Sequence, residues 1–462
     1  MVNIAAVSQM FRRRPRVALR LPRTLHTLGT NLILIPIGIA SSILIARTIG
    51  PAGKGAFDLI IATSTLLLTA LGLSLPTGIT YEVARGNANL RALALGLVLI
   101  GALQAVIGAG ILSLLVGFGH ANSILPSQYQ TWWIPAIALY LFLEMLASHW
   151  RAILVGRQEI TKSNHVELFA RVTQFLLLFL VAGFLFLNGN RITVVVLFAL
   201  VLSISVLINV LLLNALRPAF PSSGTRNPLK GAIVFALPCY FGNLVQFLNY
   251  RLDLFILSVL AGYSAVGRYT LAVSLGQLIW LLSSSAATVL LPKIAAAESS
   301  TDSIGNTNRL TRLVFSASFI SALCLGLVAS QAIPLLYGEA FRPSFPALLL
   351  ILPGIVSFSI VNVLAAYVAG IGRPGVNLKI AVVALLVTVG LDLYLIPRLN
   401  IRGASIASTA SYSVSALLTI IFYMRNTGSS LRQLLLPSSE DVALALHLAD
   451  PVLKHIRPQR AV

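Results

Sequence analysis

The sequence predicts an all-α integral membrane protein with twelve transmembrane helices arranged as two parallel six-helix bundles. Three observations predict this fold class: an apolar composition, a succession of twelve apolar runs, and an internal repeat. Of the 462 residues, 57% are apolar and 10% are charged, and the mean hydropathy is +0.90. A soluble domain carries about 25% charged residues. A chain this poor in charge cannot cover a water-facing surface, so most of it must face lipid.

Twelve apolar runs are each long enough to cross a bilayer, which takes roughly 20 mainly apolar residues in a helix. The runs are 25–49, 57–79, 90–118, 131–155, 166–187, 192–216, 231–260, 264–292, 309–335, 344–370, 375–397 and 402–424. Short connectors rich in glycine, proline and asparagine separate them, such as Gly50-Pro51-Ala52-Gly53. The seventh run is the least regular, because the polar segment Asn249-Tyr250-Arg251-Leu252-Asp253 interrupts it.

The positive charges predict the orientation, because cytoplasmic loops retain lysine and arginine. With the N-terminus inside, 24 of the 33 Lys and Arg residues fall on cytoplasmic segments and six on external connectors. This bias predicts that both termini are cytoplasmic, in the inner (plasma) membrane of the cell. The net charge of +20 therefore indicates a girdle that attracts anionic lipid headgroups, and not a nucleic-acid partner.

The chain repeats itself. The segment 50–57 matches 262–269 at an offset of 212 residues, and 154–158 matches 370–374 at an offset of 216. The offset spans six predicted helices, so the halves are parallel repeats, an architecture found in transporters with the substrate path between the bundles. The alternative is that short glycine-rich turns match by chance, which two matches at nearly the same offset disfavour.

This repeat divides the chain into five segments. They are a basic cytoplasmic N-terminus (1–24), a first bundle (25–216), a cytoplasmic linker (217–230), a second bundle (231–424) and a cytoplasmic tail (425–462).

The sequence gives no indication of catalysis, of a cofactor or of a metal site. The longest external connector, 119–131, contains no carboxylate, and no Gly-x-x-x-x-Gly-Lys-[Ser/Thr] motif for ATP occurs. Cys239 and Cys324 lie inside apolar runs without ligand spacing. We therefore expect a protein that is not an enzyme and that draws energy from a gradient, from the membrane potential or from the concentration of its substrate.

Polar groups inside the predicted spans concentrate in the seventh run. An ionisable side chain in a span costs about 2.5–3.5 kcal/mol on insertion scales and marks a candidate functional position. Arg251 and Asp253 are two residues apart and point to different helix faces, so they cannot simply pair with each other. They either face a wet cavity or have partners on neighbouring helices. Residues at spacings of three to four predict a polar stripe facing a wet cavity, and they are Asn243, Gln246, Asn249, Tyr250 and Asp253.

Other spans carry isolated charges. Glu144 lies near the middle of the fourth run and Asp392 near the end of the eleventh. Glu167 and Arg171 are four residues apart, a spacing that predicts an ion pair along one helix.

Several motifs together resemble the Wzx-type polysaccharide flippases of the multidrug/oligosaccharidyl-lipid/polysaccharide exporter superfamily. The resemblance covers about residues 25–424. The motifs are Ile45-Ala46-Arg47-Thr48-Ile49-Gly50-Pro51-Ala52-Gly53-Lys54-Gly55, Asn249-Tyr250-Arg251-Leu252-Asp253, Gly262 with Val266-Gly267-Arg268-Tyr269, Leu335-Leu336-Tyr337-Gly338-Glu339-Ala340-Phe341, Gly370-Ile371-Gly372-Arg373-Pro374 and Asn400-Ile401-Arg402-Gly403-Ala404. The resemblance implies a V-shaped central cavity between the bundles and the transfer of a polyprenyl-diphosphate-linked oligosaccharide from the cytoplasmic to the outer leaflet.

Moving the charged diphosphate through hydrocarbon has a high free-energy cost. Arginine side chains in a wet cavity reduce this cost, because a guanidinium group binds phosphate oxygens through two parallel hydrogen bonds. The hypothesis therefore assigns the diphosphate to Arg251 first and to Arg268 and Lys54 next. For Arg268, which follows an external turn, the alternative is snorkelling to the membrane surface. The sugar hydroxyls are assigned to Gln246, Asn249 and Tyr250.

If transport is coupled to an ion, Asp253, Asp58 and Glu144 are the candidate carriers. Asp58 also follows an external turn, so snorkelling is its alternative. The expected partners are the lipid-linked oligosaccharide, membrane lipids, a polysaccharide polymerase and glycosyltransferases. Two other functions stay open: a cation-coupled multidrug exporter of the same superfamily, and a membrane scaffold for glycan assembly that transports nothing.

Overall fold

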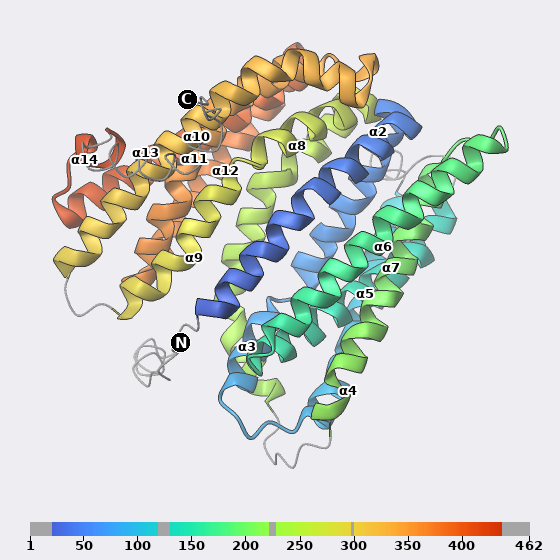
Figure 1. The fold of residues 1–462 in the computed structure, drawn as a ribbon, viewed down its shortest axis with the longest axis horizontal. Coiled ribbons are helices and arrows are strands. Elements are labelled where there is room, and N and C mark those ends of the chain that lie inside the picture. Colours follow the sequence, from blue (N-terminus) through green and yellow to red (C-terminus); the bar gives the residue numbers. More distant parts are fainter. Residues whose placement is uncertain (1–20, 119–129, 221–227, 297–299, 437–462) are drawn as a thin grey trace, which may run out of the picture.

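The computed structural model describes residues 21–118, 130–220, 228–296 and 300–436. Most of the predicted N-terminal segment, part of the linker and most of the C-terminal tail lie outside these ranges. The described residues form helices almost throughout (Figure 1). The α-helices are α2 (Leu21–Leu71), α3 (Leu75–Ala84), α4 (Leu90–Gly117), α5 (Gln130–Gly156), α6 (Ile160–Leu187), α7 (Val194–Leu216), α8 (Leu229–Gln277), α9 (Trp280–Ala296), α10 (Ser300–Tyr337), α11 (Ser344–Gly370), α12 (Pro374–Leu399), α13 (Ile401–Thr427) and α14 (Leu431–Leu435). Two short 3₁₀ helices are η3 (Arg217–Ala219) and η4 (Glu339–Phe341).

Two glycines of the repeat bend the longest helices. Gly50 in α2 has φ 66° and ψ −176°, and Gly262 in α8 has φ 77° and ψ 176°. A positive φ is strained for residues with a Cβ, so glycine is the residue that allows this bend. Helices α2 and α8 each turn back along their length (Figure 1). We call the end of the molecule where these glycines lie the glycine end.

These bends explain a difference between the predicted and the observed number of spans. Ten helices of the described chain are long and apolar enough to cross a membrane, whereas the sequence predicts twelve. Helices α2 and α8 each continue through the glycine bend, so two predicted runs join in each. The interrupting segment 249–253 does not break α8, which is helical throughout that region.

The second span of each repeat is divided. The predicted run 57–79 continues from α2 into α3 across Leu73 and Ser74, which have φ of 49° and 53°. The equivalent run 264–292 passes from α8 to α9 at Leu278 and Ile279. Both halves therefore divide the second span, although the break in the second half comes about two helical turns earlier than the repeat offset of 212 would place it.

The helices pack in two groups. Helices α2 to α7, the N-terminal helices, contact one another, and so do α8 to α13, the C-terminal helices. Contacts between the groups come mainly from α2 and α3 against α8. The largest buried apolar cluster, which includes Tyr269, Ile351 and Leu348, lies mostly among the C-terminal helices.

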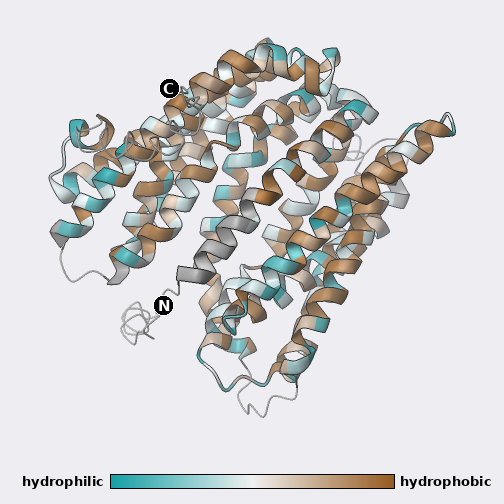
Figure 2. Ribbon diagram, in the orientation of Figure 1, coloured by the Kyte–Doolittle hydropathy of each residue, from teal (hydrophilic) through white to brown (hydrophobic). Residues whose placement is uncertain are grey.

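The outward faces are apolar, as a lipid-facing surface requires. In α4, Leu95, Leu99, Leu103 and Val106 are 60–72% exposed and recur every three to four residues along one face. Helices α4 and α6 are hydrophobic along most of their length (Figure 2). Apolar side chains exposed in continuous stripes on helices of this length indicate contact with hydrocarbon.

Repeat-equivalent glycines form a close backbone contact between the two groups. A Cβ on Gly55 would lie 1.8 Å from the Tyr263 carbonyl oxygen, and one on Gly267 would lie 2.1 Å from the Pro51 carbonyl oxygen. Gly55 and Gly267 are 212 residues apart, the offset of the repeat, so their contacts are reciprocal. This pattern indicates local two-fold symmetry where α2 and α8 cross.

Candidate functional site

The polar stripe of α8 points into the C-terminal helices. Gln246, Asn249 and Tyr250 line a cavity of about 250 Å³ enclosed by α8, α11, α12 and α13. Asn243 lies apart from them and donates a hydrogen bond to Ser74 Oγ at 2.9 Å, across to the N-terminal helices. Most of the polar stripe therefore faces the interior of the C-terminal helices, and only Asn243 reaches the N-terminal helices.

This cavity, which we call the α8 cavity, contains buried acceptors without donors. Asn249 donates Nδ2 to the Ala381 carbonyl at 2.8 Å, and Asn377 donates Nδ2 to the Ala365 carbonyl at 3.0 Å. The Oδ1 atoms of both residues have no partner among the described residues. Buried polar atoms almost always have a hydrogen-bond partner, so this cavity is suited to hold water or a small polar ligand.

Aromatic rings line one wall of the α8 cavity. The Tyr250 ring lies 5.4 Å from Trp280, 5.7 Å from Phe358 and 6.5 Å from Tyr412, centroid to centroid. Trp280 is itself fixed by donating Nε1 to the Ile355 carbonyl at 2.9 Å. These contacts bury the Tyr250 ring against its neighbours and hold it in one orientation.

Asp253 lies fully inside the C-terminal helices with a complete set of donors. Its carboxylate accepts hydrogen bonds from the Tyr269 hydroxyl, from Ser408 Oγ at 3.3 Å and from the Leu254 amide at 2.8 Å. These partners come from both parts of α8 and from α13. The arrangement ties together three segments that are distant in sequence.

Asp392 is the second buried carboxylate of this region. It is fully buried on α12, and neither carboxylate oxygen has a partner among the described residues. It lies close enough to Asp253 for the two groups to interact electrostatically. Two buried acids with only one set of donors form a site where the charge must be compensated.

Arg251 occupies the other side of α8. Two residues correspond to 200° around a helix, so Arg251 and Asp253 project from nearly opposite faces. Arg251 is half-buried, and its guanidinium has no hydrogen bond or ion pair within the described chain. Its charge still acts on Asp253 and Tyr412. An arginine within a spanning helix, on the face opposite Asp253 and without a hydrogen-bond or ion-pair partner among the described residues, is available to an anion.

Lys54 and Asp58 lie where the two groups of helices cross at the glycine end. Lys54 Nζ and Asp58 Oδ2 form an ion pair at 2.7 Å, and the Thr270 hydroxyl of α8 donates to the same oxygen. Lys54 is only 7% exposed. Both residues are thus engaged in a contact between the groups, and neither snorkels freely or joins Arg251.

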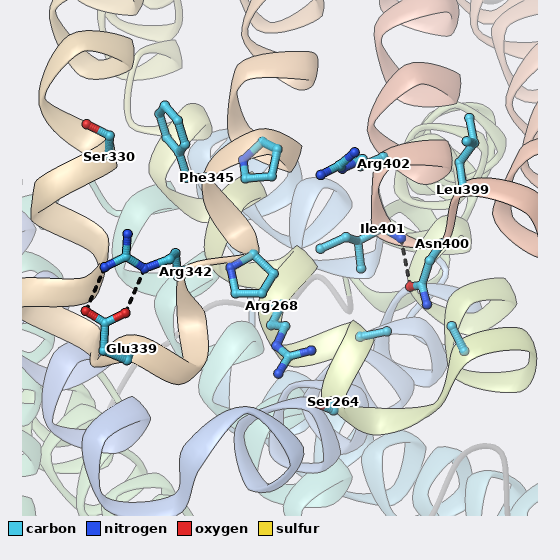
Figure 3. A pocket seen from close by; sticks show the side chains of 14 residues that line it. Ser264, Arg268, Ser330, Glu339, Arg342, Phe345, Leu399, Asn400, Ile401 and Arg402 are labelled. Carbon is cyan, nitrogen blue, oxygen red and sulfur yellow. Dashed lines mark hydrogen bonds and ion pairs between the residues drawn. The ribbon is translucent and has the colours of Figure 1, made fainter.

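Arg268 lies at a separate location. It donates Nε to the Ala340 carbonyl at 3.0 Å and lines a cavity of about 810 Å³ at the glycine end (Figure 3). The predicted diphosphate ligands Arg251, Arg268 and Lys54 therefore occupy three different places in this conformation.

Glu144 belongs to the N-terminal helices. It accepts a hydrogen bond from Ser205 Oγ at 2.6 Å, which joins α5 to α7. Glu167 and Arg171 form the predicted ion pair at 2.9 Å, and Arg151 of α5 joins it at 2.7 Å. The ion pair is confirmed and also connects neighbouring helices.

Outside the spans, basic side chains lower the pKa of two carboxyl groups. Burial opposes ionisation of Glu159 between α5 and α6, but hydrogen bonds from Lys162 and Arg157 outweigh it and lower the pKa of this carboxyl. At the glycine end, hydrogen bonds from Arg342 lower the pKa of Glu339.

The sequence reasoning missed the hydroxyl groups of this region. Ser408, Ser411, Ser415 and Thr419 are all buried on α13, at spacings of three to four residues. The last three line the α8 cavity, and Ser408 binds Asp253. The spacing is visible in the sequence, but single hydroxyls carry little insertion cost and do not draw attention as charges do. Tyr269, which resembles an ordinary apolar residue of a span, was missed for the same reason.

Solved structures with similar architecture define the class of the fold. The lipid II flippase MurJ in an inward closed conformation aligns with a TM-score of 0.69 and 13% identity, over 94% of this chain and 93% of that chain. A MATE family multidrug resistance transporter of the MOP superfamily, in an inward-facing conformation, aligns with a TM-score of 0.67 and 16% identity, over 88% and 98%. A MOP superfamily transporter from Pyrococcus furiosus gives 0.59 and 16%, over 88% and 94%. The protein is therefore a multi-pass membrane protein with the fold of the MOP superfamily of transporters.

The family follows from a sequence comparison. The model of the family described as "Polysaccharide biosynthesis protein" matches residues 24–298, more than half of the chain, and the protein belongs to this family. No curated protein matches the sequence. The family and the fold agree with the resemblance that the motifs carry.

Proposed function

We propose that the protein flips a polyprenyl-diphosphate-linked oligosaccharide from the cytoplasmic to the outer leaflet by alternating access, for surface polysaccharide export. The observation that carries this proposal is the unpaired guanidinium of Arg251 in the middle of a spanning helix. Membership of a polysaccharide biosynthesis family supports a glycan as cargo.

The proposed topology has twelve spans in two six-helix bundles, 25–216 and 231–424, joined by the linker 217–230. Counting α2 and α8 as two spans each raises the ten observed helices to twelve. The distribution of lysine and arginine supports an orientation with both termini in the cytoplasm and the glycine end outside, in the inner (plasma) membrane.

Arg251 would compensate the diphosphate during transfer. An unpaired anion in hydrocarbon is prohibitively costly, and a guanidinium fork offers phosphate two parallel hydrogen bonds. Because Arg251 faces away from the C-terminal helices, its ligand would lie between the two groups while the polyprenyl chain remains in lipid. The lipid-linked oligosaccharide and membrane lipids are the proposed partners, with a polymerase and glycosyltransferases acting before or after transfer.

The α8 cavity supports a role in coupling better than a role in sugar binding. Gln246 and Asn249 lie on the side of α8 away from Arg251, and the Tyr250 ring packs against the aromatic rings of the cavity wall, so one headgroup would not reach both sides of α8. Asp253 lies one helical turn from Asn249, which lines the cavity, and a proton at the Asp253–Asp392 pair would compensate the second buried carboxylate. We assign Asp253 and Asp392 to proton coupling, with the cavity as the route for water. Asp58 and Glu144, which are held by Lys54 and Ser205, are weaker carriers.

The first experiment compares Arg251→Ala and Arg251→Lys in vesicles that contain purified protein and a fluorescent lipid-linked oligosaccharide. Loss of two charge-assisted hydrogen bonds predicts flipping about a hundredfold slower for Arg251→Ala. Arg251→Lys should keep part of the activity, because it keeps the charge but not the fork. Ile39→Ala, at the repeat-equivalent position of α2, is the matched control and should flip normally. Normal flipping by Arg251→Ala at normal protein levels would refute the phosphate role.

A cation-coupled multidrug exporter is the second candidate, because the buried Asp253–Asp392 pair would also suit a cationic cargo. It predicts efflux of organic cations by purified protein and none of the lipid-linked oligosaccharide. Flipping by purified protein alone would exclude a scaffold that transports nothing.

A further inference from the structure

The largest cavity described above lies at the glycine end of the C-terminal helices, away from Arg251. It measures about 810 Å³ and is lined by α8 before and after the Gly262 bend, by η4 and the start of α11, and by the junction of α12 and α13 (Figure 3). We call it the glycine-end pocket. None of the proposed steps at Arg251 or Asp253 uses it.

Three guanidinium groups line the glycine-end pocket: Arg268 from α8, Arg342 after η4 and Arg402 from α13. Arg342 is neutralised by Glu339, which accepts hydrogen bonds at 2.7 Å and 2.8 Å. Arg268 uses only Nε, for the Ala340 carbonyl, and Arg402 forms no side-chain hydrogen bond or ion pair within the described chain. Two positive charges therefore stand uncompensated around one cavity.

The backbone adds to this positive potential. Helices α11 and α13 both begin at the pocket, with Phe345 and Pro346 at one N-terminus and Ile401 and Arg402 at the other. Helix N-termini carry partial positive charge and favour anions. Asn400 caps α13 by accepting a hydrogen bond from the Ile401 amide at 2.8 Å, which fixes the position of Arg402 relative to the pocket.

We infer that the glycine-end pocket binds a phosphate or diphosphate ester that arrives from the outer side of the membrane. Arg268 and Arg402 come from different helices, so they can take an anion between them, and guanidinium forks match phosphate oxygens. The already paired Glu339–Arg342 couple limits the net charge of the pocket. Binding itself does not rest on the proposed flippase function, although the outward position rests on the charge-based orientation.

The test measures protection of a single thiol in the pocket. Ser330→Cys is placed in a chain carrying Cys239→Ala and Cys324→Ala, and right-side-out vesicles are labelled with a membrane-impermeant maleimide. Inorganic diphosphate added outside should slow labelling as the pocket fills. Arg402→Gln should weaken this protection about tenfold, since a charge-assisted hydrogen bond is lost.

Arg398→Gln is the matched control. Arg398 lies four residues before Arg402, at the end of α12, but its guanidinium stacks on the Tyr394 ring at 3.9 Å, outside the pocket lining. Its removal should leave protection unchanged. Equal weakening by both substitutions, or labelling that diphosphate never slows, would overturn the inference. Labelling confined to inside-out vesicles would overturn the outward position.

Two further measurements keep the result decisive. If Ser330→Cys does not reach the membrane, calorimetry of inorganic diphosphate with the purified natural chain and with Arg402→Gln should give the same tenfold difference, and equal or absent binding would overturn the site. Arg251→Ala should retain full protection, so failure of the flippase proposal and failure of this site are distinguishable.

The lipid composition identifies the source of the phosphate. Labelling is compared in vesicles of phosphatidylcholine alone, with added phosphatidylglycerol, and with added polyprenyl diphosphate. Slow labelling with phosphatidylglycerol indicates a resident lipid headgroup, whereas slow labelling only with polyprenyl diphosphate indicates an exit position for the transported lipid. Protection by inorganic diphosphate and by neither lipid indicates a soluble phosphate ester.

Discussion

The first spans of the two halves have similar backbone conformations but different polar side chains. At the repeat offset of 212, Asn249, Arg251 and Asp253 of α8 correspond to Ile37, Ile39 and Ser41 of α2. Ser41 satisfies its own hydroxyl by donating to the Ile37 carbonyl at 2.8 Å, whereas Asp253 recruits partners from other helices. Tyr269, which binds Asp253, corresponds to Phe57, which has no hydroxyl.

The features that the two halves do share are conformational. Both retain the glycine with positive φ, the close-contact glycine five residues later and the divided second span. The repeat therefore supplies a symmetric frame, and the polar groups proposed for transport are concentrated in the C-terminal half.

The largest expected effect concerns the reciprocal glycines. Gly55→Ala and Gly267→Ala each place a methyl group within about 2 Å of a carbonyl oxygen of the other group of helices. Overpacking against backbone cannot be relieved by a rotamer change, so each should destabilise the protein by about 3 kcal/mol or more. Thermal unfolding of the purified protein in detergent measures this loss.

Gly38→Ala and Gly110→Ala are the controls, since nothing lies within 4 Å of a Cβ at either position. Both should be neutral or stabilising, because alanine has the higher helix propensity. A large loss at only one of Gly55 and Gly267 would contradict the symmetric contact.

The next effect tests the asymmetry at the buried carboxylates. One proton moved across 100 mV contributes about 2.3 kcal/mol, which supports roughly a fortyfold concentration ratio. Asp253→Asn, and separately Asp392→Asn, should abolish this driven component and leave downhill flipping. The measurement is flipping in vesicles with and without an imposed proton gradient.

Ser41→Ala, at the position equivalent to Asp253, should keep the driven component in full. If Asp253→Asn and Asp392→Asn also keep it, the carboxylate pair does not couple transport, and the C-terminal half loses that part of its proposed role.

The difference between the halves also explains how far sequence reasoning reaches. The turns at Gly50 and Gly262 are predictable, because a positive φ is a local demand that glycine meets. The opposite faces of Arg251 and Asp253 are also predictable, since two residues turn a helix by 200°. Which face meets its own bundle depends on packing against α11 to α13, and the periodicity of α8 alone does not contain this information.

Contacts between residues far apart in the sequence were also not predictable from the sequence, because they too depend on how the helices pack. Asp58 follows an external turn in the sequence and resembles a snorkelling residue, yet Thr270, 212 residues away, donates a hydrogen bond to it. Likewise, Arg268 and Arg402 belong to different motifs and line one cavity only after folding.

The smallest predicted effect concerns a polar pair at repeat-equivalent positions. Asp58 and Thr270 occupy equivalent positions in the repeat, and the Thr270 hydroxyl donates to Asp58 across the crossing of α2 and α8. Alternating access requires this end to open, and a hydrogen bond across it favours the closed state by about 1 kcal/mol. Thr270→Val should therefore raise the open population about fivefold. Pulsed spin-label distances between the two groups at the glycine end measure the shift.

Thr65→Val removes a hydroxyl that donates only within its own helix, to the Ile61 carbonyl at 2.8 Å, and should leave the distances unchanged. Equal distances in Thr270→Val and the natural chain would mean that the glycine contacts alone hold the end closed, and that Asp58 and Lys54 contribute to folding without restraining the transition.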